Sequence, residues 1–165
     1  MPTGSGSWPR RGRSWAAGRE LDILVNNAGQ TMFRPVTETT AEDYARIMAT
    51  NLESCFHLAQ LAHPLLVAAA SSGGGDSSSV VNVSSIGGIV SYPALSVYSA
   101  TKGAMNQLTR SLAVEWAKDN VRVNCVAPGG VRTDIASSSG LKLDPEVARI
   151  MWEAEMARVP LRRIG

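Results

Sequence analysis

The sequence has few of the residues that build metal centres or disulfide frameworks. It contains two cysteines and two histidines in 165 residues. Cys55 and Cys125 lie far apart, without the close spacing of a zinc site or a redox pair, and His57 and His63 have no third ligand near them. We therefore expect no metal ion, and two free thiols in a reducing compartment.

Long apolar runs and a strong charge of one sign are also missing. No run reaches the roughly 18 apolar residues that a membrane-spanning helix needs, and the beginning of the chain has no apolar signal core. With 16 basic and 14 acidic residues, the net charge of +2 is too small to attract a nucleic acid. Neither a membrane nor a nucleic acid is expected as a partner, and the expected location is cytoplasmic.

The beginning of the chain differs from the rest. Residues 1–20 mix Gly, Ser, Pro, Arg and Trp without the periodicity of a strand or a helix, so we expect an irregular leader there. Residues 1–19 are rich in Arg and Ser and contain no acid, which is typical of an organellar transit peptide, the alternative to a cytoplasmic location. Residues 21–165 are expected to form one folded domain.

Buried strands and amphipathic helices alternate along this domain. Three short apolar runs predict strands, and two longer periodic stretches predict helices, the first of which Pro64 should kink or end. The strands are expected at 21–25, 80–83 and 121–126, and the helices at 40–70 and 96–118. This order implies parallel strands joined by helices, so the predicted fold is a single α/β domain: a partial Rossmann-like, doubly wound sheet in a three-layer α/β/α arrangement.

Two further helical features follow from the pattern. The second long helix carries an apolar row at every fourth residue, which is predicted to face the core or an interface. The row consists of Ala100, Ala104, Leu108, Leu112 and Trp116. Asp144-Pro145-Glu146 predicts the start of another short helix, because an acidic cap precedes a proline.

Ligands in open α/β sheets bind at the carboxyl ends of the strands. Here those ends are Asn26–Gly29, Ser84–Gly88 and Pro128–Thr133, and all three are polar or rich in glycine. Tyr98 and Lys102 begin the second long helix four residues apart, so their side chains lie on one face, which we expect to point away from the core.

These residue types suit proton transfer to a carbonyl oxygen. A phenol such as that of Tyr98 is a poor proton donor at neutral pH unless a nearby cation, here Lys102, favours the phenolate. Ser85, at the end of a strand, could donate a hydrogen bond to an oxygen on which charge develops. A Tyr-x-x-x-Lys pair alone is also common on solvated helix surfaces, so the interpretation depends on the wider pattern.

That wider pattern resembles the short-chain dehydrogenase/reductase family. The motifs, in order along the chain, are Asn26-Asn27-Ala28-Gly29, Asn51, Ser85, Tyr98-x-x-x-Lys102, and Asn124-x-Val126-x-Pro128-Gly129-x-Val131-x-Thr133. The resemblance implies an oxidoreductase in which Tyr98 is the proton donor or acceptor, Ser85 positions the substrate oxygen, and Lys102 favours the Tyr98 phenolate. It also implies that Tyr98 and Lys102 contact the cofactor, the lysine through the nicotinamide ribose.

The resemblance assigns roles to residues around this centre. Asn51 would interrupt its helix and hold a water that connects Lys102 to solvent, or act only as a helix-kink residue. Asn26, Ala28 and Gly29 would line the adenosine side of the cofactor, with Asn27 bracing the sheet.

The segment after the third strand completes the implied cofactor site. Pro128, Gly129, Val131 and Thr133 match cofactor-binding positions, and the last two match residues that contact the nicotinamide carboxamide. For the glycines, including Gly29, the alternative is a turn that needs positive φ.

Within the family, residues 96–124 resemble the tropinone-reductase-like plant reductases. This implies reduction of a ketone to an alcohol, usually with NADPH, so NADP(H) is the expected cofactor and NAD(H) the alternative. The candidate substrate wall at 86–95 and 135–156 is mostly apolar, which favours a small hydrophobic ketone or alcohol. A homo-oligomer, dimer or tetramer, is expected for an intact member.

The sequence departs from the family at both ends. The family's Thr-Gly-x-x-x-Gly-x-Gly phosphate-binding turn is not matched, because Trp8 and Arg10 occupy the later glycine positions after Thr3-Gly4-Ser5-Gly6. The family's last strand has no counterpart either. We therefore expect a truncated catalytic portion. The alternatives are a catalytically inactive chain that acts through helix-mediated association, and an epimerase or dehydratase with the same Tyr-x-x-x-Lys pair.

Overall fold

The computed structural model describes residues 19–72, 77–135, 139, 146, 149, 153 and 156–163. The predicted leader at 1–20 lies outside the described residues except for its last two, which are exposed. Asp144 and Pro145, the predicted start of a short helix, lie outside them too, as does most of the candidate substrate wall at 135–156. The described part contains the sheet and all of the predicted reaction centre.

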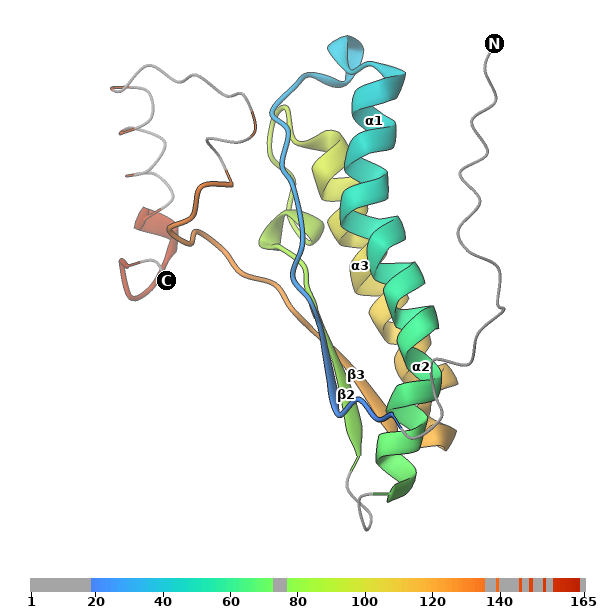
Figure 1. Ribbon diagram of the computed structural model, residues 1–165. Coiled ribbons are helices and arrows are strands. Elements are labelled where there is room, and N and C mark those ends of the chain that lie inside the picture. Colours follow the sequence, from blue (N-terminus) through green and yellow to red (C-terminus); the bar gives the residue numbers. More distant parts are fainter. Residues whose placement is uncertain are drawn as a thin grey trace, which may run out of the picture.

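Three parallel strands form the sheet (Figure 1). β1 spans Ile23–Asn26, β2 spans Ser78–Val83 and β3 spans Val121–Val126, and they lie in the order β1-β2-β3. The three predicted strands are confirmed, with bounds that differ by no more than two residues. Because the strands are parallel, their carboxyl ends share one edge of the sheet.

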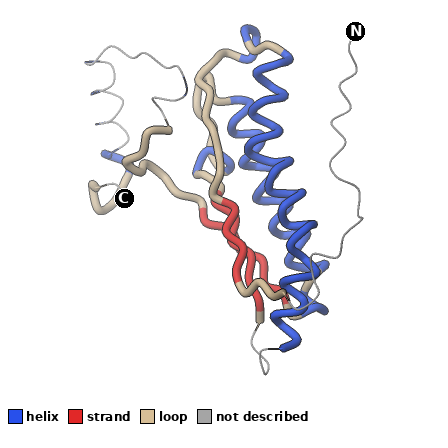
Figure 2. The backbone as a smooth tube through the Cα atoms, viewed as in Figure 1, coloured by secondary structure: helices blue, strands red, loops and turns tan. Residues whose placement is uncertain are grey.

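The long helices α2 (Ser54–Ser72) and α3 (Ser96–Glu115) lie on the same face of this sheet (Figures 1 and 2). The strands follow one another in sequence order, and two crossovers of the same hand then place both helices on one side. The α/β class and the Rossmann-like parallel sheet are confirmed. The described residues provide the sheet and one of the two expected helical layers.

The predicted first helix consists of three consecutive segments. α1 spans Ala41–Met48. Its N-cap is Thr40, whose hydroxyl accepts a hydrogen bond from the Asp43 N–H, as the capping pattern predicts. A π-helical turn follows at Ala49–Glu53, before α2 begins. Such single π turns alter the direction of side chains within a helix and occur often at functional sites.

Of the two predicted effects of Pro64, a kink or an end of the helix, the second does not occur, because α2 continues through Pro64 to Ser72. A proline in a helix interior leaves the carbonyl of the residue four positions earlier without its usual donor. Here that residue is Gln60, and both Gln60 and Pro64 are exposed. Water can therefore satisfy the carbonyl, and the helix persists.

The core lies between the sheet and the two long helices, and the later part of the predicted apolar row of α3 contributes to it. Leu66, Val80, Leu112 and Val121 form its centre. Of the predicted row, Leu112 is buried, Leu108 and Trp116 are partly buried and pack against the core, and Ala100 is exposed. A step of four residues drifts by about 40° per step around a helix, so a row of five cannot stay on one face.

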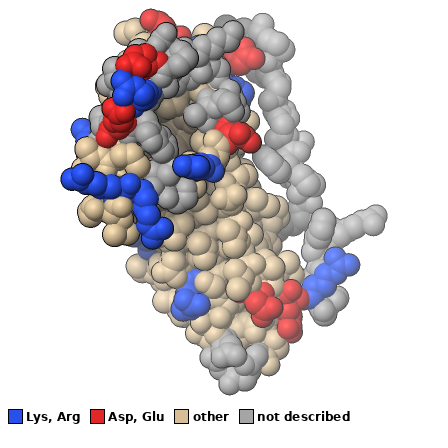
Figure 3. Space-filling view, turned by 90° about the vertical axis from the view of Figure 1, so that its left-hand side faces the viewer, with Lys and Arg blue, Asp and Glu red and all other residues tan. Residues whose placement is uncertain are grey.

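The opposite face of the sheet is open within the described residues. Its apolar side chains Ile23, Val25 and Val126 are 60%, 55% and 49% exposed. Figure 3 shows this side of the molecule as a largely uncharged surface with a few basic and acidic side chains. Separately, no helix among the described residues is both long and apolar enough to span a membrane.

Candidate active site

Asn26 ends β1 and ties the sheet to α3. Its Nδ2 donates to Asn82 Oδ1 across the strands at 2.8 Å, and Asn82 Nδ2 donates to Thr109 Oγ1 of α3 at 2.9 Å. The sheet-bracing role was expected of Asn27, but the side chain that braces the sheet is that of Asn26. Asn26 pairs with Asn82 on the neighbouring strand and is buried on the helix side, whereas Asn27 is exposed. Asn26 as a whole is only 4% exposed, so it offers little surface to a ligand in the described structure.

The π-helical turn directs Asn51 into the interior, where it is fully buried. Its Oδ1 accepts from the Gln30 N–H at 2.8 Å, and its Nδ2 donates to the Gln30 carbonyl, also at 2.8 Å. The same Nδ2 donates to Thr101 Oγ1 of α3 at 3.2 Å. The predicted interruption of the helix is confirmed, and Asn51 joins the loop after β1 to the helix that carries Tyr98.

Gly29 lies where this loop passes the lysine. A methyl group at position 29 would lie 3.5 Å from Lys102 Nζ and 3.6 Å from Asn51 Oδ1. Neither Gly29 nor Gly129 has a positive φ, so the alternative of a strained turn does not hold for them. The missing side chain instead leaves space beside the Lys102 ammonium group.

Lys102 lies inside the molecule, contrary to the expectation that it points away from the core. Its side chain is 3% exposed, and Nζ donates to the Val83 carbonyl at the end of β2, at 2.8 Å. Burial holds the pKa of Lys102 below its usual value, and the nearby thiols of Cys55 and Cys125 partly offset this. Nζ is 5.8 Å from the centroid of the Tyr98 ring, so the predicted pair is brought together.

Ser85 lies at the same edge of the sheet, directly after β2. It begins a 3-10 turn at Ile86–Gly88, and its Oγ accepts from the Gly87 N–H at 3.0 Å. A methyl group at Gly87 would lie 3.4 Å from Ser85 Oγ and 3.5 Å from Tyr98 Cε1. Both side chains therefore border the same small space, and the Ser85 hydroxyl keeps its own proton for donation.

Three residues hold this turn against α3: Gly88 and Ser84, which lie in the predicted strand end but had no predicted role there, and Asn106, which was not predicted. A methyl group at Gly88 would lie 2.6 Å from the Lys102 carbonyl carbon and 2.8 Å from its oxygen, so only glycine fits. Ser84 Oγ donates to the Lys102 carbonyl at 3.1 Å, and Asn106 Nδ2 donates to the Gly88 carbonyl at 3.2 Å. The Gly-Gly pair after the serines was the only local signal in the sequence.

Of the residues at the third strand end, Pro128–Thr133, only Pro128 lies beside the other site residues. The Ile86 N–H donates to the Pro128 carbonyl at 2.9 Å, which brings Pro128 beside the Ser85 turn. Gly129, Val131 and Thr133 follow on an exposed segment, and nothing among the described residues lies within 4 Å of a methyl group placed at Gly129. Ala28, at the first strand end, is exposed as well.

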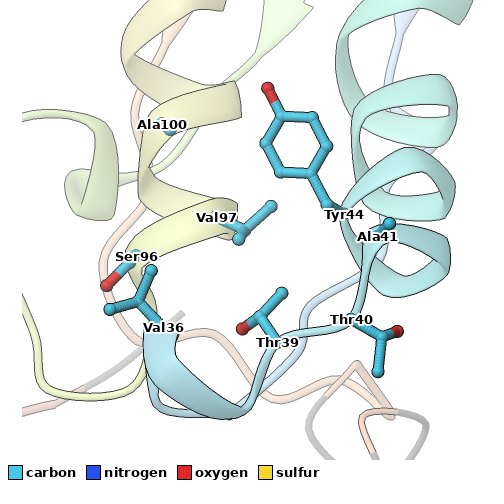
Figure 4. A pocket seen from close by; sticks show the side chains of 8 residues that line it. All are labelled: Val36, Thr39, Thr40, Ala41, Tyr44, Ser96, Val97 and Ala100. Carbon is cyan, nitrogen blue, oxygen red and sulfur yellow. The ribbon is translucent and has the colours of Figure 1, made fainter.

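A separate open groove of about 460 Å³ lies between the beginnings of α1 and α3 (Figure 4). Tyr44 of α1 and Val97 of α3 project into it, with Val36 and Thr39 from the preceding segment. Its lining does not include Tyr98 or the other predicted reaction-centre residues, so it is not the predicted substrate site.

The cluster places two hydroxyl groups beside a buried cation, an arrangement that can support acid–base chemistry. Ser85, Tyr98 and Lys102 come from the end of β2 and the beginning of α3, and Asn51 and Gly29 border the lysine. Among the described residues, no group of three or more His, Cys, Asp or Glu side chains is arranged to hold a metal ion.

The sequence of this chain is similar to those of known proteins. The family model of the short chain dehydrogenases matches residues 14–144. A tropinone reductase homolog of Arabidopsis thaliana is 48% identical over 146 residues, which cover 88% of this chain and 51% of that protein. A tropinone reductase homolog of Datura stramonium is 46% identical over the same length and coverage. The chain spans about half the length of these curated relatives.

Two solved structures have a similar fold. A gluconate 5-dehydrogenase from Burkholderia cenocepacia, in complex with NADP and tartrate, superposes with a TM-score of 0.74 at 29% identity, covering 88% of this chain and 52% of that one. An NADH-dependent reductase complexed with NAD superposes with a TM-score of 0.64 at 30% identity, covering 68% and 47%. Similar chains thus carry either nicotinamide cofactor.

Proposed function

This chain belongs to the short-chain dehydrogenase/reductase family, in the plant tropinone-reductase-like subgroup, and on that premise we propose that it serves NAD(P)H-dependent reduction of a ketone to an alcohol. The observation that carries the proposal is the convergence of Ser85, Tyr98 and Lys102 at one edge of the sheet. Gly87 lies between the first two side chains, and Lys102 Nζ is 5.8 Å from the centroid of the Tyr98 ring.

The residues present fit a nicotinamide cofactor. Space beside Lys102 is left by Gly29, and a lysine ammonium has three N–H donors, of which one is directed to Val83 in the described structure. The remaining donors suit ribose hydroxyl groups. The backbone of 26–29 and the segment Pro128–Thr133 would hold the rest of the cofactor, which supplies the hydride when bound. We propose NADP(H) as the favoured form and NAD(H) as the alternative.

The side chains around the substrate oxygen divide the work of proton transfer. Ser85 Oγ accepts a hydrogen bond from the Gly87 N–H, so its own O–H can donate a hydrogen bond to the carbonyl oxygen. Tyr98 protonates that oxygen. Lys102, whose charge is buried and poorly screened, stabilises the phenolate that Tyr98 becomes.

The side chain of Asn51 is less available for a proton relay than the family resemblance implies. Its side-chain amide is already engaged with Gln30 and Thr101. A proton relay through Asn51 would therefore use its main-chain carbonyl, which accepts a contact from Cys55 Sγ at 3.4 Å.

Apolar side chains near the site favour a hydrophobic substrate. Ile89 and Val90 follow the Ser85 turn and are 71% and 44% exposed, and Val131, after β3, is 46% exposed. A small alicyclic or bicyclic ketone can bury such surface, whereas a sugar would leave its hydroxyl groups without polar partners.

The test is a fluorescence titration of the folded chain with NADPH and then NADH, followed by ketone-dependent oxidation of whichever binds. Saturable binding with turnover of a bicyclic ketone supports the proposal. A chain that is folded by circular dichroism but binds neither cofactor would overturn it.

An association role is the second candidate, and exposed apolar side chains on the helices favour it. Phe56 and Leu61 of α2 are 44% and 62% exposed, and Val114 of α3 is 80% exposed. We propose that this helical surface forms the contact of a homo-oligomer, whether or not the chain is active. Light scattering of the wild type and of Leu61→Glu would show a loss of oligomer in the variant, and a monomeric wild type would contradict the proposal.

A further inference from the structure

Thr101 is a fully buried hydroxyl placed between two parts of the reaction centre. It precedes Lys102 on α3, and its Oγ1 donates to the Tyr98 carbonyl at 2.7 Å. The same Oγ1 accepts from Asn51 Nδ2 at 3.2 Å. Its single proton and an acceptor lone pair are thus both engaged, one within the helix and one across to the π-helical turn.

Asn51 carries the connection to the loop after β1. Its amide bonds both the N–H and the carbonyl of Gln30, so the loop is held at two points. Gln30 directly follows Gly29, the residue that borders Lys102 Nζ. A continuous path of hydrogen bonds therefore runs from the turn that bears Tyr98 to the loop that borders the lysine.

The path continues on the surface and returns to the beginning of α3. Gln30 Oε1 accepts from Arg46 Nη1 at 3.0 Å, and Arg46 Nη2 donates to Asp43 Oδ1, also at 3.0 Å. Asp43 pairs with Arg34, whose backbone N–H donates to the Ala94 carbonyl at 2.8 Å. Ala94 lies two residues before α3, so the path closes around the helix turn that carries the tyrosine.

The buried half of this ring should matter more than the exposed half. Exposed ion pairs such as Asp43 with Arg46 are screened and contribute little. A buried amide that loses its partner cannot be compensated by water. Without the Thr101 hydroxyl, one N–H of Asn51 Nδ2 would lose its acceptor inside the fold, while the other would still donate to the Gln30 carbonyl.

We propose that Thr101 is a positioning residue that holds the Tyr98 turn of α3 and the Gly29 loop in fixed relation across the site. The consequence for turnover rests on the proposed function, whereas the placement itself does not. Thr101 touches neither the reacting atoms nor the space beside Gly87 in the contacts described, so it acts through Tyr98 and Asn51.

The same helix offers a matched control. Thr109 is also buried, donates to the carbonyl four residues earlier, at Met105, and accepts from the side-chain amide of Asn82. Thr101→Val and Thr109→Val therefore delete the same pair of hydrogen bonds at two places on α3. Only the first place bonds to the Tyr98 carbonyl and, through Asn51, to Gln30 in the loop after β1, whereas Thr109 connects through Asn82 to Asn26 at the end of β1 itself.

The first measurement needs no cofactor. Amide hydrogen exchange of Gln30 and the ring resonances of Tyr98 are compared by NMR in wild type, Thr101→Val, Thr101→Ser and Thr109→Val. We expect about tenfold faster exchange at Gln30, and a shifted Tyr98 signal, in Thr101→Val alone, with wild-type values restored in the serine variant. Equal changes in both valine variants, or none in Thr101→Val, would overturn the proposal.

The second measurement separates placement from chemistry. In a chain that turns over, Thr101→Val should lower kcat about tenfold with less than about twofold change in cofactor Kd, and Thr101→Ser should restore kcat. A fall in kcat that Thr109→Val shares would assign the effect to stability and contradict the proposal. If the wild type binds no cofactor, the proposed function fails, and the exchange data alone decide the placement. Should Thr101→Val not fold, Thr101→Cys replaces it with the same expectations.

Discussion

Lys102 Nζ donates a 2.8 Å hydrogen bond to the main-chain carbonyl of Val83, the last residue of β2. The bond fixes the first turns of α3 to the end of a strand, at the edge where Ser85 begins its turn. It also means that the cation is held inside the fold rather than on a solvated helix face. Placement of the lysine for chemistry therefore has a cost in stability, which depends on pH.

The pH dependence follows from the direction of the shift. Burial lowers the pKa of Lys102 below its usual 10.5, so between the two values the unfolded chain binds more protons than the folded chain. Stability then rises with pH in that interval. We expect the free energy of unfolding of wild type to gain on that of Lys102→Met as the pH rises toward the usual pKa of 10.5, in urea titrations at each pH.

The control for this experiment is Lys118→Met, at an exposed position soon after α3. Its unfolding free energy should follow that of the wild type across the same range. Parallel curves for wild type and Lys102→Met would mean that the buried ammonium does not titrate as argued.

Two neighbouring glycines should respond differently to the same substitution. In Gly88→Ala the new methyl group would lie 2.6 Å from the backbone of Lys102, whereas in Gly87→Ala its nearest neighbours are side-chain atoms at 3.4 Å or more. We expect Gly88→Ala to lower the free energy of unfolding by about 1–3 kcal/mol, and Gly87→Ala to change it by less than about 1 kcal/mol.

Chemical denaturation of both glycine variants tests this. Turnover separates them further, because a methyl group at position 87 would enter the space between Ser85 and Tyr98. Gly87→Ala should therefore lose activity while it keeps its stability. Equal stability of the two variants would contradict the close packing of the turn on α3.

The convergence of the candidate site residues was predictable because they follow two simple geometric rules. Parallel strands bring Ser85 and Asn26 to one edge of the sheet, and a spacing of four puts Tyr98 and Lys102 on one side of a helix. Neither rule states which side of the helix meets the sheet. The prediction that Lys102 points away from the core was therefore wrong.

The supporting contacts were not predictable from local pattern. Gly88 contacts Lys102, and Asn51 contacts Thr101, although the residues of each pair are far apart in the sequence. No periodic pattern in the sequence indicates such contacts. Such contacts depend on how two elements pack, and their residue types are also common on surfaces. The exposure of the sheet's second face, at Ile23 and Val25, likewise follows from the assembled layers rather than from the strand pattern.

The turn before α3 contains a strained residue. Ala94 has φ of 62°, in the left-handed region that disfavours residues with a side chain, and it follows Pro93. Ala94→Gly should raise the free energy of unfolding by about 0.5 kcal/mol, because relief of strain exceeds the added flexibility of the unfolded chain. Asn120, at φ of 56°, is the comparison, since asparagine tolerates this region and Asn120→Gly should gain less. Thermal unfolding of both variants decides; a larger gain at position 120 would refute the argument.

Tyr98→Phe tests the proton donor directly. The change removes one hydroxyl and leaves the ring whose centroid is 5.8 Å from Lys102 Nζ, so cofactor binding should stay within about twofold of the wild type. Turnover of a ketone should fall by about 100-fold or more, the usual effect of losing a general acid.

Tyr44→Phe is the matched control, because Tyr44 lies in the groove between α1 and α3 and is absent from the proposed reaction centre. Fluorescence titration gives binding and NADPH absorbance gives turnover. A comparable loss of cofactor affinity in Tyr98→Phe would assign the tyrosine a binding role instead, and an equal loss of turnover in Tyr44→Phe would show that the assay reports a general disturbance of the helices.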